Sequence, residues 1–92
     1  MATVVIAPSE RISIRAILRD IFENADIKTW TISNGKTVLT HTQYGGKVHL
    51  YQGGYLIVSA DSDDYEALTL GAFINLLHRR AKASVKAITI VF

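Results

Sequence analysis

Three glycine-containing turn signals divide the middle of this chain into four short segments, and that spacing constrains the fold more than any other feature. The signals are Asn34-Gly35, Gly45-Gly46 and Gly53-Gly54. Asn and Gly tolerate the positive φ angles that tight hairpin turns require. The segments between the turns alternate polar and apolar residues, as half-buried strands do. Residues 27–60 therefore predict a four-stranded antiparallel meander.

The turns also predict how these strands pair. A two-residue first turn places Trp30 opposite Leu39, and a two-residue second turn places His41 opposite Leu50. At the third turn, a three-residue loop with a glycine bulge places Leu50 opposite Leu56, whereas a two-residue loop would mix the two faces. Alternation then predicts a buried face of Trp30, Ile32, Leu39, Val48, Leu50, Leu56, Val58 and Ala60. The opposite face, which we name the tyrosine face, is Tyr44, His49, Tyr51, Tyr55 and Ile57.

The segments before the meander predict a strand and a helix. Residues 3–7 are β-branched and apolar without alternation, which indicates a strand covered on both faces and ended by Pro8. Ser9 is a suitable N-cap for a helix over residues 10–24. The apolar stripe of that helix is Ile14, Ile17, Leu18, Ile21 and Phe22.

After the meander, the chain predicts a second helix over residues 64–82 and a last strand over 85–92. Asp63 and Glu66 have the spacing of a capping box at the helix start. One apolar stripe of this helix is Leu70, Phe73, Ile74, Leu77 and Ala81. A second stripe, Tyr65, Leu68, Ala72 and Leu76, requires another partner, which is either the first helix or a second chain. The last strand is almost wholly apolar, which favours an inner position in the sheet.

The order strand, helix, four strands, helix, strand predicts a single α+β domain. We expect a two-layer sandwich in which two helices cover one face of a mainly antiparallel sheet. The outer elements match a split βαβ plan, as in a ferredoxin-like variant with a longer meander. A topological analogy of this kind carries no function.

Composition excludes several classes of protein. The chain has 92 residues, no cysteine and a formal charge of +2. It therefore has no disulfide or thiolate metal site, and its charge alone does not indicate nucleic-acid binding. Apolar runs fall short of the roughly 20 residues of a membrane span. We expect a cytoplasmic protein without a membrane segment.

Groups that suggest chemistry have simpler structural explanations. The acidic residues Asp61, Asp63, Asp64 and Glu66 lack the glycine and closing glutamate of an EF-hand, so they suit helix capping. His41 and His49 do not form a zinc-binding motif with each other or with His78. We expect a hydrogen-bonded structural role for His41, on the inward face, while His49 is the better functional candidate. Nucleophile and cofactor motifs are missing from the sequence, so we predict no catalytic residue, metal or cofactor.

Three surfaces remain as candidates for partner binding. Tyr44, His49, Tyr51 and Tyr55 of the tyrosine face offer broad aromatic contact area. The second surface is a row of arginines spaced four residues apart: Arg11, Arg15 and Arg19. This row either binds phosphates or is a solvated flank whose aliphatic stems cover the apolar stripe of the helix. The second stripe, Tyr65, Leu68, Ala72 and Leu76, offers a homodimer seam.

These features favour a non-enzymatic protein that binds a larger protein partner. A domain of this size has little room for a deep pocket beside its core. Inhibitors, immunity proteins and phage or mobile-element accessory proteins of this size commonly act by occluding a partner. The alternative is nucleic-acid binding through the arginine row. A small enzyme would instead show a deep pocket that holds His41 or His49 beside a carboxylate.

Overall fold

The computed structural model describes residues 2–23 and 28–91. Within them, six strands and two α-helices follow in the predicted order, with a short 3₁₀ helix, η1, before the last strand. Their bounds are β1 (Thr3–Pro8), α1 (Ile14–Glu23), β2 (Trp30–Ser33), β3 (Val38–His41), β4 (Lys47–Gln52), β5 (Leu56–Ala60), α2 (Glu66–Ala81), η1 (Lys82–Ser84) and β6 (Val85–Val91). Asn24, Ile27 and Phe92, at the ends of predicted elements, lie outside the described residues.

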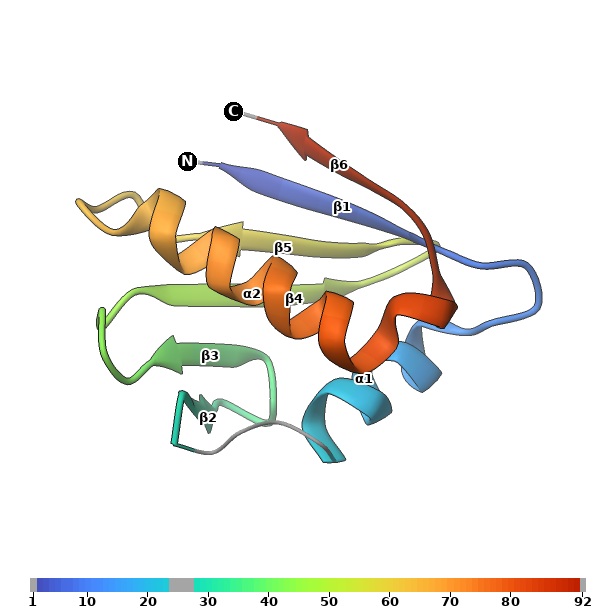
Figure 1. Cartoon of the computed structure of the whole chain (residues 1–92), viewed down its shortest axis with the longest axis horizontal. Helices are drawn as coiled ribbons and strands as arrows, with labels where there is room; N and C mark the ends of the chain where they lie inside the picture. The colour runs from blue at the N-terminus through green and yellow to red at the C-terminus, as the bar shows by residue number, and fades with distance from the viewer. Residues whose placement is uncertain (1, 24–27, 92) are drawn as a thin grey trace.

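The strands form one antiparallel sheet in the order β2-β3-β4-β5-β1-β6. Both helices lie over the same face of this sheet, which confirms the two-layer α+β prediction (Figure 1). Both β5 and β6 run antiparallel to β1, so they are parallel to each other. The unit β5-α2-β6 is therefore a split βαβ unit with β1 inserted between its strands, as predicted for the first strand.

The core lies between the sheet and the two helices. The predicted buried face is confirmed, since its members are all buried except the half-buried Ile32. Val4 and Ile6 of β1 extend that face, and the fully buried Ile17 and Phe73 pack on it from the helices. On its outer side β1 is only half-buried, so it is not covered on both faces as predicted.

Strand pairing differs from the prediction by an even number of residues at each hairpin. Trp30 pairs with His41 and not with Leu39, a shift of two. The backbone N–H of Leu50 donates to the Thr37 carbonyl at 2.8 Å, and β4 is displaced by four from the predicted pairing with His41. Leu50 pairs with Val58 and not with Leu56, again a shift of two. Because side chains alternate with a period of two, even shifts leave every residue within the strands β2 to β5 on its predicted face.

Loop conformation explains the first two shifts. Residues 34–36 all have positive φ angles, of 51°, 63° and 66°, so the first connection is longer than a two-residue turn. In the second connection, His41 Nδ1 accepts the backbone N–H groups of Gln43 and Tyr44, both at 3.2 Å. This side-chain acceptor closes a turn directly after His41, so β3 ends there.

The first helix begins four residues later than predicted. Arg11 has a φ of 68°, which is incompatible with a right-handed helix, and α1 starts at Ile14. The hydroxyl of Ser13 accepts the Ala16 backbone N–H at 3.1 Å and so caps the helix. Ser9, the predicted cap, instead donates its backbone N–H to the carbonyl oxygen of Ser84 in η1 at 2.9 Å.

The predicted capping box at α2 does not form. Asp63 Oδ1 accepts the backbone N–H of Tyr65 at 2.8 Å, just before the helix. The Glu66 carboxylate does not accept the backbone N–H of Asp63, because its Oε1 accepts the backbone N–H of Ala2 at 2.9 Å. The acidic start of α2 therefore ties the helix to the beginning of β1.

The last strand lies at the edge of the sheet and not in an inner position. β6 pairs with β1 on one side only, and its residues from Lys86 to Val91 are exposed. Figure 1 shows α2 crossing the sheet over β4 and β5, with α1 near its C-terminal end and β6 at the far edge beyond β1. The inward side of β6 is left open, since Ile88 and Ile90 are exposed.

Candidate functional site

The outer face of the sheet, opposite the helices, carries most of the predicted tyrosine face. Tyr51 of β4 pairs with Ile57 of β5, and both side chains point outward. Tyr51 is 56% exposed and Ile57 38% exposed. Tyr55 lies in the loop that joins these two strands and is 55% exposed. We name His49, Tyr51, Tyr55 and Ile57 the outer tyrosine patch.

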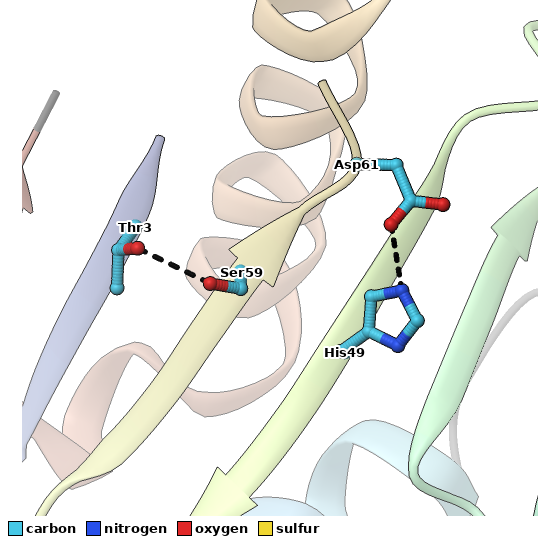
Figure 2. A network of polar contacts seen from close by, with 4 residues as sticks. All are labelled: Thr3, His49, Ser59 and Asp61. Atoms are coloured by element: carbon cyan, nitrogen blue, oxygen red, sulfur yellow. Dashed lines mark hydrogen bonds and ion pairs between the residues drawn. The ribbon is translucent and has the colours of Figure 1, made fainter. Parts of the chain in front are cut away.

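His49 is held in place by a carboxylate on the outer face. Its Nε2–H donates to Asp61 Oδ1 at 2.8 Å, across the gap between β4 and the end of β5 (Figure 2). His49 also pairs directly with Ser59 of β5. The Ser59 hydroxyl shares a hydrogen bond with the Thr3 hydroxyl at 3.1 Å, so its contact is with β1 (Figure 2). These polar contacts tie together three neighbouring strands beside the outer tyrosine patch.

The gathering of Ser59, His49 and Asp61 was not predicted from the sequence. Their residue types are those of a serine-hydrolase triad, but the Ser59 hydroxyl engages Thr3. Two cavities, of about 300 and about 160 Å³, lie on the other side of the sheet between α2 and β6. Neither cavity is lined by His41 or His49, so the arrangement expected of a small enzyme is met only by the carboxylate beside His49.

Tyr44 does not belong to the outer face, which corrects its predicted position. Its ring stacks on His41, with centroids 4.3 Å apart, and on Tyr65, with centroids 6.1 Å apart. His41 in turn meets the edge of Trp30 at 4.9 Å, and Trp30 meets Phe73 at 6.3 Å. A continuous series of rings therefore runs from the surface into the core on the helix side. The prediction failed because the chain leaves β3 at His41, before strand alternation reaches Tyr44.

His41 has the hydrogen-bonded structural role that was predicted. Its side chain is buried, and Nδ1 accepts two backbone N–H groups of the turn that follows it. An accepting Nδ1 requires the neutral imidazole with its proton on Nε2. Burial lowers the pKa of His41 below its ordinary value of 6.5, because desolvation disfavours the charged form.

The second stripe of α2 is divided between two environments. Leu76 is fully buried and Ala72 half-buried, on the helix that packs against α1. Tyr65 and Leu68 are 47% and 52% exposed. The first helix is therefore the second partner of α2 over the C-terminal half of the stripe. Only the N-terminal half remains open as a seam.

The arginine row is interrupted. Arg15 and Arg19 are exposed and lie four residues apart on α1, whereas Arg11 precedes the helix with its positive φ. Arg19 Nε lies 3.9 Å from Asp20 Oδ1, so part of its charge is balanced locally. The basic surface of α1 therefore comprises two arginines.

The acidic cluster is dispersed over separate contacts. Asp61 accepts from His49, while Asp63 and Glu66 accept backbone N–H groups of Tyr65 and Ala2. Within residues 2–23 and 28–91, no three His, Asp or Glu side chains gather as metal ligands. In the same residues, neither helix combines the length and apolar character that a membrane crossing needs. Comparison with protein-family models, with curated proteins and with solved structures finds no match for this chain.

Proposed function

We propose that this chain is a non-enzymatic protein-binding module that occludes a larger protein partner through the outer tyrosine patch. The observation that carries the proposal is an open sheet face with large exposed side chains. Both α1 and α2 cover the opposite face, so neither described helix lies over Tyr51, Tyr55 and Ile57. Clusters of exposed aromatic and apolar side chains on a rigid element are typical of protein interfaces.

The geometry of the patch suits a contact surface. Tyr51 and Ile57 face each other across two neighbouring strands, so their positions are set by the sheet and not by a mobile loop. A tyrosine buries a large ring at a low cost in side-chain entropy and keeps a hydroxyl for a hydrogen bond. His49, with its ring oriented by Asp61, adds a polar group at the margin. This combination of an apolar centre and a polar rim is the usual composition of binding surfaces.

Site-specific photo-cross-linking in the cells that naturally produce the protein tests this proposal. A photoreactive phenylalanine analogue is placed at Tyr51 or, as a matched control, at Tyr65. Both side chains are tyrosines of similar exposure, but they lie on opposite layers of the sandwich. We expect a discrete protein adduct from position 51 and none from position 65. An adduct that forms at 65 and not at 51 would move the interface to the open half of the α2 stripe.

Nucleic-acid binding through α1 is the second candidate function, favoured by the exposed pair Arg15 and Arg19. Charge reversal of both residues to Glu removes that surface without touching the outer tyrosine patch. If this function operates, the wild-type chain binds DNA or RNA with an affinity that falls as salt rises, and the double variant does not. Binding unchanged by the double variant would exclude the arginine pair.

A further inference from the structure

β6 presents a long, apolar and open edge. The strand spans Val85–Val91, and its only charged residue is Lys86. The inward-pointing Ile88 and Ile90 are 38% and 46% exposed, because the helix layer ends before it reaches them. Soluble proteins usually shorten such an edge, place charges on it or cover it, since an open strand pairs readily with another strand.

The backbone groups at this edge can be identified from the pairing. Ala60 donates its N–H to the Ala2 carbonyl, so the even-numbered residues of β1 bond to β5 and the odd-numbered ones bond to β6. Since Thr3 pairs with Val91, the odd-numbered residues of β6 turn their backbone groups to β1. The register shifts between Ala7 and Pro8, so this alternation holds from Ala87 to Val91. Within that range, the residues whose N–H and C=O point to the open edge are Ile88 and Ile90.

We propose that a second copy of this chain pairs with that edge, β6 antiparallel to β6, with Ile88 opposite Ile88 of the second copy. In this two-fold register the outward-pointing Ile88 residues pair with each other, and Lys86 of each strand lies opposite Ile90 of the second copy. The two copies of Lys86 are about 14 Å apart along the strands, beyond the Debye length of about 8 Å in physiological salt. The edge is therefore self-complementary in hydrogen bonding and in charge.

The two cavities between α2 and β6 form one groove along β6, and the grooves of the two copies are complementary in the same way. The larger cavity lies towards the start of β6 and is lined by His78, Lys82 and Lys86 together with apolar residues of α2 and β6. The smaller cavity is lined by apolar and small residues of α2 together with Ile90, and Ile74 lines both. Antiparallel pairing brings the basic end of each groove opposite the apolar end of the other. Side chains of the second copy can then cover both ends without a contact between like charges.

The dimer is independent of the proposed function and would extend it. Edge-to-edge pairing continues the sheet into a second copy, so both outer tyrosine patches face the same direction. A partner with repeated binding sites would then be held by two patches at once, which strengthens binding by raising the effective concentration. Because Ile88 is not part of the patch, failure of the dimer and failure of the patch are separate results.

Light scattering coupled to size-exclusion chromatography tests the dimer on the full chain. We expect a mass of about twice the 10.1 kDa of one chain, falling toward one chain on dilution. The Ile88→Lys variant places two lysines opposite each other and should weaken the dimer at least about tenfold. Thr89→Lys is the matched control, because residue 89 points to the outer face, and it should leave the mass unchanged. A single-chain mass for the wild type, or a dimer that Ile88→Lys does not weaken, overturns the proposal.

Disulfide trapping tests the register and does not depend on the lysine variant folding well. The chain contains no cysteine, so an Ile88→Cys variant has one thiol. Directly opposed residues in a hydrogen-bonded pair have Cα atoms about 5.5 Å apart, within disulfide range. We expect rapid oxidation to a covalent dimer at 88 and slower oxidation for Thr89→Cys. Faster trapping at 89 than at 88 would overturn the register.

Discussion

Gly46 lies so close to Thr69 that a Cβ atom on residue 46 would come within 1.9 Å of the Thr69 hydroxyl oxygen. The loop between β3 and β4 therefore packs its backbone directly on α2, and a side chain at position 46 has no space. The Thr69 hydroxyl is buried and has no hydrogen-bond partner among the described residues. The contact is one of shape, and glycine at 46 is required for it.

The first prediction follows from this contact. Gly46→Ala should lower the free energy of unfolding by about 1–3 kcal/mol, because the added methyl group overpacks the interface. In a Thr69→Ala background the same substitution should cost less, since the clashing hydroxyl is gone. Thr69→Val is the matched control, because it retains the shape of threonine and should preserve the full cost of Gly46→Ala. Denaturant unfolding of the six proteins, three backgrounds each with and without Gly46→Ala, measures the coupling, and equal costs in all backgrounds would contradict the contact.

The second prediction concerns pH. The pKa of His41 is lowered in the folded state by burial, so the unfolded chain binds a proton at this group more readily. The stability that neutral His41 provides is therefore fully present above about pH 6.5, the unfolded value. It is lost as the pH falls below 6.5 toward the lower folded pKa, with a slope of at most about 1.4 kcal/mol per pH unit.

The control for this prediction is His41→Asn. Asn Oδ1 can accept the same two backbone N–H groups as His41 Nδ1, but it does not titrate. The variant should lose the ring contacts with Tyr44 and Trp30, yet its stability should vary less between pH 7 and pH 5 than that of the wild type. Unfolding curves at several pH values decide the matter. Identical pH slopes for the two proteins would show that another group is responsible.

The third prediction concerns the residue before α1. Arg11 has a φ of 68°, a conformation that a β-carbon disfavours and glycine adopts freely. Arg11→Gly should therefore raise the free energy of unfolding by up to about 1 kcal/mol. Arg19→Gly, inside α1, removes the same charge but should cost about 1 kcal/mol, because glycine disfavours a helix interior. A destabilising effect of both substitutions would contradict the left-handed conformation at Arg11.

The inward and outward faces of the meander were predictable because they depend only on alternation and on whether the loops hold an odd or even number of residues. The exact pairing was not. It depends on the positive φ of Lys36, which is an unusual residue for that conformation, and on the His41 side chain accepting from its own turn. A three-residue third loop closed by Gln52 and Leu56 gives the observed register and places His49 opposite Ser59. The predicted β4–β5 pairing was wrong by two residues, so it did not bring His49 close to Asp61.

The open edge at β6 was not predictable from composition, because a buried inner strand and a strand that binds another chain are equally apolar. What distinguishes them here is how far the helix layer extends: Val4 and Ile6 of β1 are fully buried, whereas Ile88 and Ile90 of the neighbouring β6 are exposed. In the same way, the second stripe of α2 is apolar along its length, but α1 covers only the part that contains Leu76. Which apolar side chains are buried by an element distant in sequence depends on tertiary packing, and the periodicity of the sequence does not predict it.

The central claim is that the outer tyrosine patch binds a protein partner. The most direct test is calorimetric titration of the Tyr51→Ala variant with the free partner protein that photo-cross-linking identifies, and Tyr65→Ala is the control. We predict that Tyr51→Ala raises the Kd at least about tenfold, equivalent to about 1.4 kcal/mol, while its unfolding midpoint stays close to that of the wild type. Tyr65→Ala should leave the Kd unchanged. A wild-type Kd for Tyr51→Ala, in a protein that remains folded, would contradict the account.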